Sequence, residues 1–156
     1  MKITLRSLIL LAALLVSGAA VADTGEVDAL RGFFNAVSSK NYAAAWSAFT
    51  RHTQDLVVQN VADSEKMSVQ DVRKLFDTND ESIQAGFWES FRQSSQSPVI
   101  AGLPMSAAGK QLDADGSVSI SFTNGNQVTV LMYQEGGGWK VGWMETFFPG
   151  GKVPVK

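Results

Sequence analysis

The chain is 156 residues long, and its 13 lysine and arginine residues against 15 aspartate and glutamate residues give a formal net charge of −2. The basic residues are scattered, so the sequence lacks the positive patch that nucleic acid or an anionic membrane surface attracts. It contains no cysteine, which excludes a disulfide framework, a thiol nucleophile, a cysteine-ligated zinc site, an iron–sulfur cluster and a cysteine-linked lipid anchor.

The first 22 residues have the three parts of a secretory signal peptide. Lys2 and Arg6 supply a positive start, residues 8–16 are a short apolar run, and residues 20–22 (Ala-Val-Ala) form a small-residue cleavage site. The apolar run is shorter than the roughly 20 residues that a membrane-crossing helix needs. We therefore expect cleavage after Ala22, export to a Gram-negative periplasm, and no membrane anchor in the mature chain.

Residues 26–93 have the apolar spacing of amphipathic helices. One apolar stripe covers residues 27–37, and Asn41 is placed to cap a second helix through residues 42–49. A third helix is expected over residues 53–62.

Two capping boxes predict further helix starts. Ser68 with Asp71, and Thr78 with Glu81, have the three-residue offset of such a box. The second of these helices would carry its apolar residues on one line, Ile83, Phe87 and Phe91.

From Pro98 onward the apolar pattern becomes alternating and is broken by turns. Residues 117–122 alternate serine with apolar side chains, as in a half-buried strand. Asn124-Gly125 predicts a hairpin to a second strand over residues 127–134. We expect a last strand over residues 139–147 and, before these strands, a curved or irregular strand from residue 99 to residue 112.

Together these elements predict the α+β fold class, with N-terminal helices packed on one face of a curved antiparallel sheet. Residues 23–148 are expected to form a single domain, and residues 149–156 a loose C-terminal tail.

Two short motifs resemble the nuclear transport factor 2-like superfamily. Residues 33–37 (Phe-Phe-Asn-Ala-Val) followed by 40–46 (Lys-Asn-Tyr-Ala-Ala-Ala-Trp) are similar to its first helix, polar turn and returning helix, and residues 138–141 (Gly-Trp-Lys-Val) to its last strand. The resemblance implies a cystatin-like cone fold, in which a curved sheet wraps round helices and forms an apolar pocket. That superfamily includes ketosteroid isomerase-like and polyketide-cyclase-like enzymes and non-catalytic binding modules. The long helical stretch over residues 51–93 departs from its usual pattern.

Glu145 is the first candidate for a functional carboxylate. On a strand over residues 139–147 it would share one face with Trp139 and Trp143. A pocket lined by these rings would raise the Glu145 pKa and suit it to act as a base or to orient a ligand. If the opposite face is the inner one, Glu145 points away from the pocket.

The enzyme interpretation has three further candidates, the carboxylate of Asp55 and the phenols of Tyr42 and Tyr133. Chemistry of the ketosteroid isomerase type needs a base and a proton donor that converge on one substrate oxygen. Such residues are more often a surface carboxylate and core tyrosines.

Tryptophans carry the binding interpretation. Trp46, Trp139 and Trp143 are expected to line a ligand pocket, and Trp88 lies off the Phe87–Phe91 line and is expected at an exposed contact surface.

Metal binding is not expected, and neither is a cofactor. His52 is the only histidine, and a lone imidazole without further His or Cys ligands cannot make a typical zinc site. Asp113 and Asp115 resemble the start of a calcium loop, but the distal glutamate is missing, so we interpret this segment as a hairpin turn.

The leading hypothesis is a non-enzymatic exported domain that binds a small apolar ligand or a protein partner, with a homodimer through the open face of its sheet. The 4 Trp and 9 Phe residues in a chain without a catalytic motif suit a pocket or an interface. The alternatives are an isomerase- or cyclase-like enzyme with Glu145 or Asp55 as base, and a structural or assembly factor of the cell envelope. A buried carboxylate facing a tyrosine hydroxyl across a pocket would favour the enzyme, and a filled cone the binding domain.

Overall fold

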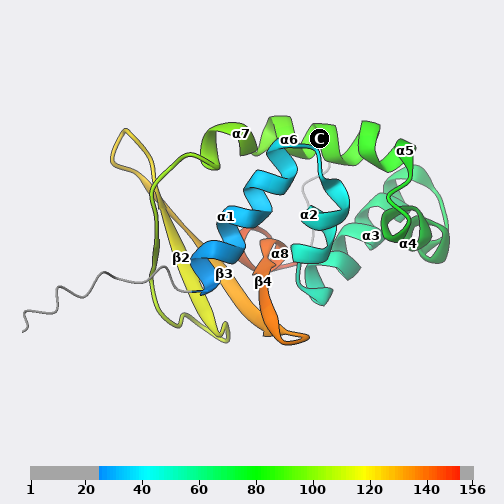
Figure 1. Ribbon diagram of the computed structural model, residues 1–156. Helices are drawn as coiled ribbons and strands as arrows, with labels where there is room; N and C mark the ends of the chain where they lie inside the picture. Colours follow the sequence, from blue (N-terminus) through cyan, green and yellow to red (C-terminus); the bar gives the residue numbers. More distant parts are fainter. Residues whose placement is uncertain (1–24, 152–156) are drawn as a thin grey trace, which may run out of the picture.

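The structure is a computed structural model that describes residues 25–151, so the expected signal peptide and the end of the tail lie outside the described residues. Helices precede a four-stranded antiparallel sheet, which confirms the α+β class (Figure 1). The helices before the sheet are α1 (Gly25–Ser38), α2 (Tyr42–Ala48), α3 (Arg51–Glu65), α4 (Val69–Asp77), α5 (Glu81–Ile83), the π-helix η1 (Gln84–Trp88), α6 (Glu89–Ser94) and α7 (Ser97–Ile100). The strands are β1 (Met105–Ala107), β2 (Gly116–Ser121), β3 (Gln127–Glu135) and β4 (Gly138–Gly142), and α8 (Trp143–Phe147) follows them. Over residues 25–151, no helix combines the length and the apolar character that a membrane crossing requires.

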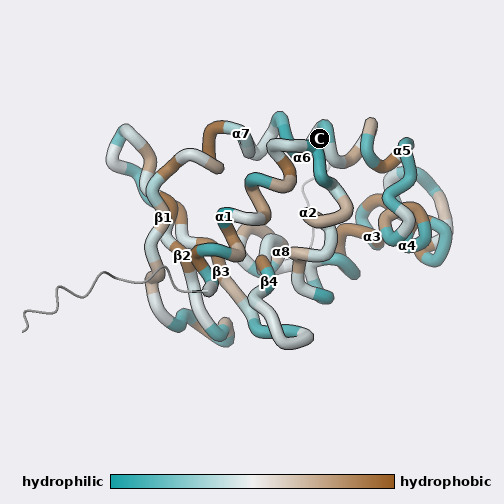
Figure 2. The backbone as a smooth tube through the Cα atoms, in the orientation of Figure 1, coloured by the Kyte–Doolittle hydropathy of each residue, from teal (hydrophilic) through white to brown (hydrophobic). Residues whose placement is uncertain are grey.

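Helix α1 buries the apolar stripe that the sequence predicts. Brown and teal segments alternate along it in Figure 2, as expected for a helix with one face on the core. The buried residues of α1 are Val27, Leu30, Phe33, Phe34 and Val37. The chain then reverses direction, and the Asn41 side chain caps α2 by accepting a hydrogen bond from the Ala44 N–H at 3.3 Å.

The capping pattern of the long helical stretch is confirmed at one position and wrong at another. Ser68 caps α4, since its Oγ accepts from the Asp71 N–H at 3.1 Å. The next helix begins after Asp80, whose side chain accepts from the Ser82 N–H at 3.0 Å. Thr78 instead ends α4, because its backbone N–H and its hydroxyl both bond to the Lys74 carbonyl. The expected capping box at Thr78 is therefore two residues out of place.

The sheet is a meander in the order β1-β2-β3-β4, with every neighbouring pair antiparallel. The predicted hairpin joins β2 to β3, and Gly125 adopts the positive φ of 83° that its turn requires. The expected strand over residues 99–112 is largely wrong. Only β1 is extended there, and α7 covers the start of that segment as a helix.

The two faces of the sheet differ in character. Val118, Ile120 and Val130 are buried in one core cluster with residues of the helices. On the opposite face, the Ser119 and Thr129 hydroxyls lie side by side, 3.1 Å apart. The helices therefore cover one face of the sheet, and the other face carries these two hydroxyls beside the buried side chains of Ser117 and Leu131.

The expected last strand over residues 139–147 is wrong in its second half. Strand β4 ends at Gly142, and α8 begins directly after it. The backbone N–H of Leu131 donates to the Thr146 hydroxyl at 2.9 Å, and that of Met144 donates to the Thr53 hydroxyl at 3.0 Å. The two threonine hydroxyls thus accept the backbone N–H groups that a longer β3–β4 pairing would otherwise use, and the chain continues as helix α8.

Candidate functional site

A hollow of about 340 Å³ opens to the surface beside the end of α1. We call it the Tyr42 hollow. It is lined by Lys40, Tyr42, Glu81, Gln84, Ala85 and Glu89. The lining comes from two stretches of chain, the reversal between α1 and α2 and the segment from α5 to α6.

The reversal after α1 brings Lys40 and Tyr42 to the hollow. Lys40 adopts a left-handed backbone with φ of 63°, and the Asn41 N–H bonds back to the Ala36 carbonyl at 2.8 Å. Tyr42 is the first residue of α2, and its ring is 2% exposed. The ring stacks on Trp88, with centroids 5.4 Å apart and planes 5° from parallel.

The π-helix η1 forms the other wall. A π-turn holds an extra residue compared with an α-turn, so it shifts the faces of the helix, and such turns are frequent at functional sites. Here the shift turns Trp88 inward, where it is 1% exposed, and places Glu89 at the hollow. The Glu89 N–H bonds to the carbonyls of Gln84 and Gly86.

Three donors converge on the Glu89 carboxylate. The Tyr42 hydroxyl donates to Oε1 at 2.6 Å, and the Lys40 Nζ lies 3.0 Å from the same oxygen. The Arg92 Nε donates to Oε2 at 3.3 Å. The carboxylate is therefore held in place from both of its oxygens.

These contacts move the two pKa values of the pair in opposite directions. Burial, followed by the hydrogen bond to Glu89, raises the pKa of Tyr42 to about 12. The hydrogen bond from Tyr42, followed by that from Lys40, lowers the pKa of Glu89 to about 2. General acids and bases work best with pKa values near the ambient pH, so this pair holds a fixed charge rather than a transferable proton.

Glu145 lies in α8, and the expectation that it shares a strand face with Trp139 and Trp143 is wrong. Its two carboxylate oxygens accept hydrogen bonds from the hydroxyls of Thr50 and Thr53, each at 2.6 Å. Thr50 is the N-cap of α3, so the carboxylate lies at the positive end of that helix. Glu145 therefore links α8 to the start of α3 through these two hydrogen bonds.

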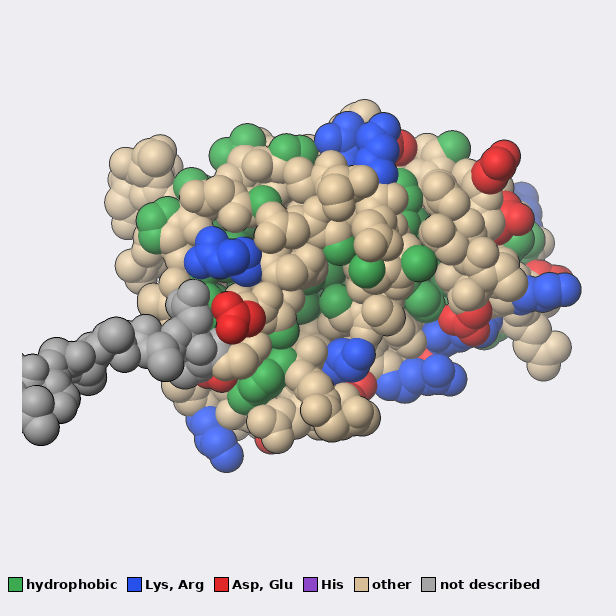
Figure 3. All heavy atoms as spheres, viewed as in Figure 1, with side chains coloured by type: hydrophobic (Ala, Val, Ile, Leu, Met, Phe, Trp, Pro, Cys, Tyr) green, Lys and Arg blue, Asp and Glu red, His purple; other side chains and the backbone are tan. Residues whose placement is uncertain are grey.

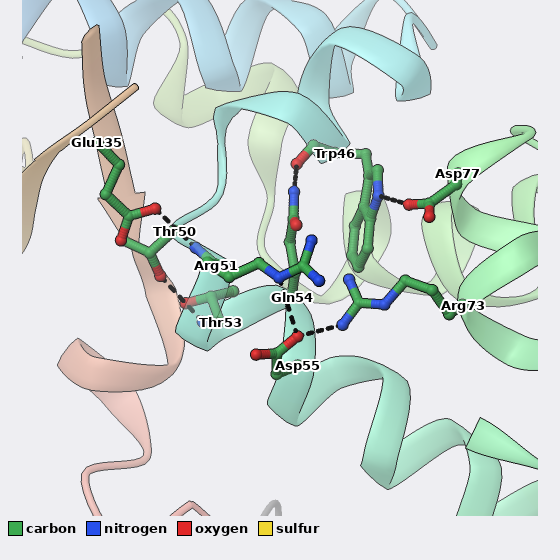
Figure 4. A network of polar contacts seen from close by, with 9 residues as sticks. All are labelled: Trp46, Thr50, Arg51, Thr53, Gln54, Asp55, Arg73, Asp77 and Glu135. Carbon is green, nitrogen blue, oxygen red and sulfur yellow. Dashed lines mark hydrogen bonds and ion pairs between the residues drawn. The ribbon is translucent and has the colours of Figure 1, made fainter. Parts of the chain in front are cut away.

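Asp55 is exposed and lies between two arginines (Figure 4). It pairs with the Arg51 Nε at 3.4 Å and with the Arg73 guanidinium. The Arg73 Nη1 is buried and has no hydrogen-bond partner among the described residues, but the guanidinium lies 5.8 Å from the centroid of the Trp46 ring. A cation over an aromatic face is attracted to it. Asp55 is thus part of a surface ion-pair network.

The expected pocket tryptophans lie in separate places. The Trp46 Nε1 donates to the Asp77 carboxylate at 3.0 Å, and the Trp46 ring stacks on Phe76 with centroids 4.4 Å apart. The ring centroid of Trp143 lies 4.8 Å from that of Phe91, among other aromatic rings. Trp139 instead lies against Gly25 and Gly116. Trp46 and Trp143 thus pack on other aromatic rings, and Trp139 lies at the edge of the core.

Trp88 is buried, so the expectation of an exposed contact surface at this residue is wrong. Its ring is stacked between those of Tyr42 and Phe49. The π-turn is the physical reason, because it shifts Trp88 out of the position that regular α-helical spacing assigns.

The remaining polar candidates form no site with one another. Tyr133 donates to Asp113 at 3.4 Å, and burial raises its pKa to about 12. Asp115 accepts from the Gln134 N–H at 2.7 Å, and His52 is exposed in the first turn of α3. Within residues 25–151, no group of three or more His, Asp or Glu side chains is arranged to hold a metal.

A second open hollow, of about 250 Å³, lies where the β3–β4 turn meets α2 and α3. Its charged side chains already have partners within the described residues, since Arg51 pairs with Asp55 and the other two bind backbone atoms. Glu135 accepts from the Arg51 N–H at 2.9 Å, and the Lys140 Nζ donates to the Ser47 carbonyl at 2.5 Å. These contacts tie the turn to the helices, so the Tyr42 hollow is the stronger candidate site.

Comparison of the chain with protein-family models, with curated proteins and with solved structures finds no match in any of the three. The candidate site therefore rests on geometry. Sequence reasoning considered Tyr42 but missed Lys40 and Glu89. The available signal for Tyr42 was its place directly after the capping residue Asn41, and no local pattern marks Glu89 as its partner.

Proposed function

We propose that this chain is an exported, non-enzymatic binding domain and that the Tyr42 hollow is its recognition site. The observation that carries the proposal is the 2.6 Å hydrogen bond between the Tyr42 hydroxyl and Glu89 at the edge of a 340 Å³ hollow. The bond holds a negative charge at a fixed position next to open space. A few well-placed polar groups of this kind orient a ligand in a binding site.

The pKa values favour binding over catalysis. With the pKa of Glu89 near 2 and that of Tyr42 near 12, neither group changes its protonation state near neutral pH. The enzyme alternative with Glu145 or Asp55 as base gains no support, since threonines hold the first and arginines the second.

The assembly-factor alternative needs a continuous exposed apolar patch. The large apolar side chains that are exposed among the described residues come from four stretches of chain, with two of them at the start of α4. They are Met67, Val69, Val99, Leu112 and Phe147. The outer sheet face carries the hydroxyls of Ser119 and Thr129, which is a poor match for the apolar centre of a homodimer interface. We therefore assign recognition to the hollow.

We also propose that the fold is a variant of the nuclear transport factor 2-like cone. The support is the α1–α2 reversal before an antiparallel meander and the position of residues 138–141 in its last strand. The variant elements would be the helical stretch from α3 to α6 and the replacement of the strand end by α8.

Native mass spectrometry of the mature protein, purified from its own envelope, tests the binding proposal. We expect a small mass that is released on unfolding and that is absent from the Glu89→Gln variant. Glu65→Gln, an exposed glutamate at the end of α3, is the matched control and should keep the mass. A bound mass that Glu89→Gln also retains would contradict the assignment of the hollow as the site.

A further inference from the structure

We propose that Asn124, at the tip of the β2–β3 hairpin, is a self-modification site whose side-chain amide is lost as ammonia to the backbone nitrogen of Gly125. The folded turn slows this reaction, and opening of the turn releases it. The inference is independent of the proposed function, because the hairpin tip contributes no residue to the Tyr42 hollow.

The reaction needs only the two neighbouring residues and water. The Gly125 nitrogen attacks the Asn124 Cγ, so that a new N–C bond closes a cyclic imide and the bond from Cγ to the side-chain nitrogen breaks. Ammonia leaves with the proton that the Gly125 nitrogen loses. Water then opens the imide at either carbonyl, which yields aspartate or isoaspartate, the isomer in which the backbone runs through the side chain. Groups on adjacent residues react without an enzyme because little entropy is lost in bringing them together.

Asn124 is the asparagine that the sequence favours for this reaction. It is the only asparagine in the chain that precedes a glycine. Glycine has no Cβ, so no side chain crowds the approach of its nitrogen to the Asn124 Cγ. Residues 123–127 are exposed, so water and hydroxide reach both reacting groups. Asn126 lies in the same exposed turn but precedes Gln127, whose side chain hinders the corresponding attack.

The hydrogen bonds of the turn occupy both reacting groups. The Gly125 N–H donates to the Phe122 carbonyl at 3.0 Å, and this bond opposes the loss of the proton from the attacking nitrogen. The Asn126 N–H donates to the Asn124 Oδ1 at 3.0 Å and holds the side chain against the turn. The Phe122 N–H closes the hairpin with a 2.8 Å bond to the Asn126 carbonyl. Attack therefore requires the turn to open, and its rate follows the fraction of molecules in which the turn is open.

The modification changes the charge of this part of the molecule. No charged residue occurs in the sequence between Asp115 and Glu135. The hairpin tip is the projection at the upper left of Figure 1, and on the face that Figure 3 shows it carries neither red nor blue. A carboxylate at position 124 gives the tip its first charge, and isoaspartate adds an atom to the backbone of the turn. An aged molecule thus differs from a new one at an exposed end of the sheet.

The test is incubation of the mature protein at mildly alkaline pH, in native buffer and in urea, with samples taken over several weeks. Peptide mass mapping follows the gain of one mass unit at each asparagine, and isoaspartate-specific methylation identifies the isomer. We expect the gain first at Asn124, and a rate in urea about tenfold or more above the native rate, because urea removes the hydrogen bonds of the turn. Asn126 is the internal control, since it is exposed in the same turn.

Three variants separate the opening of the turn from the reaction itself. Thr129→Gly removes the hydroxyl that lies 3.1 Å from that of Ser119 across the hairpin, so it should speed the native reaction severalfold and leave the rate in urea unchanged. Ser90→Gly, at an exposed position of α6, lowers stability away from the hairpin and should leave both rates unchanged. Asn124→Gln should show no gain at position 124 over the same time, because its longer side chain would have to close a larger ring. Melting temperatures show that each variant is folded.

Three results would overturn the inference. If Asn124 gains no mass in urea, the reaction does not occur at this site. If the rates in native buffer and in urea are equal, the turn does not slow the reaction. If Asn126 reacts as fast as Asn124, the glycine does not direct the reaction to its neighbour.

Discussion

The Tyr42 hydroxyl and the Glu89 carboxylate are 47 residues apart in the chain and 2.6 Å apart in the structure. Tyr42 is the first residue of α2, and Glu89 is the first residue of α6. Trp88, the residue before Glu89, stacks on the Tyr42 ring. Two adjacent residues, Trp88 and Glu89, therefore hold the Tyr42 ring and bind its hydroxyl. The charge and shape of the hollow thus depend on the π-helix that ends at Trp88.

Alkaline titration should show two tyrosines with high pKa values. Tyr42 and Tyr133 are the two tyrosines of the chain, and burial is the largest cause that raises the pKa of each from 10.0 to about 12. The native protein should give little tyrosinate absorbance until the pH approaches 12, whereas the unfolded protein should titrate near 10. The native state then binds more protons than the unfolded state between these values, so the free energy of unfolding should fall as the pH rises from 10 to 12. Native ionisation near pH 10 would contradict the burial of both phenols.

Glu145→Gln should destabilise the fold by about 1–3 kcal/mol, the range for disturbing partly buried hydrogen bonds to a charged group. The carboxylate accepts from both Thr50 and Thr53, whereas an amide has one acceptor oxygen and would direct its NH₂ at the other hydroxyl. Urea denaturation measures the change. Glu65→Gln serves as the surface control, and an equal small effect of both variants would argue against the tie between α8 and α3.

Two glycines should respond to alanine in opposite directions. At Gly142 a Cβ would lie 2.5 Å from the Tyr133 ring and 3.1 Å from the Leu131 carbonyl, so Gly142→Ala should cost about 1–3 kcal/mol. At Gly32, within α1, a Cβ meets nothing within 4 Å, so Gly32→Ala should stabilise by about 0.5–1 kcal/mol. Thermal melts of both variants check the pair. A neutral Gly142→Ala would mean that the Tyr133 ring moves aside freely.

Export should remove the start of the chain. Expression of the full sequence in a Gram-negative host, followed by fractionation, should yield a periplasmic protein whose N-terminal residue is Asp23. Ala22→Pro should leave the precursor uncleaved, because the small-residue site is lost. A cytoplasmic protein that keeps its first residues would contradict the localisation.

The sequence alone determined those elements whose partners are local. The α1 stripe is buried as its helical spacing predicts, and Asn41 and Ser68 cap the helices that follow them. Asn124-Gly125 forms the predicted hairpin turn between β2 and β3. In each case the deciding interaction spans a few residues, so spacing and residue type contain the information.

Tertiary contacts decided the end of the sheet and the candidate site. The predicted last strand runs through residue 147, yet Thr53, some 90 residues earlier, accepts the Met144 N–H, and α8 forms after Gly142 instead. Glu145 therefore meets two threonines in place of a pocket. The Tyr42 hollow likewise requires a π-turn that joins Trp88 and Glu89 to a residue of α2. Only the folded chain determines such pairings, because the free energy of these contacts depends on groups that the sequence keeps far apart.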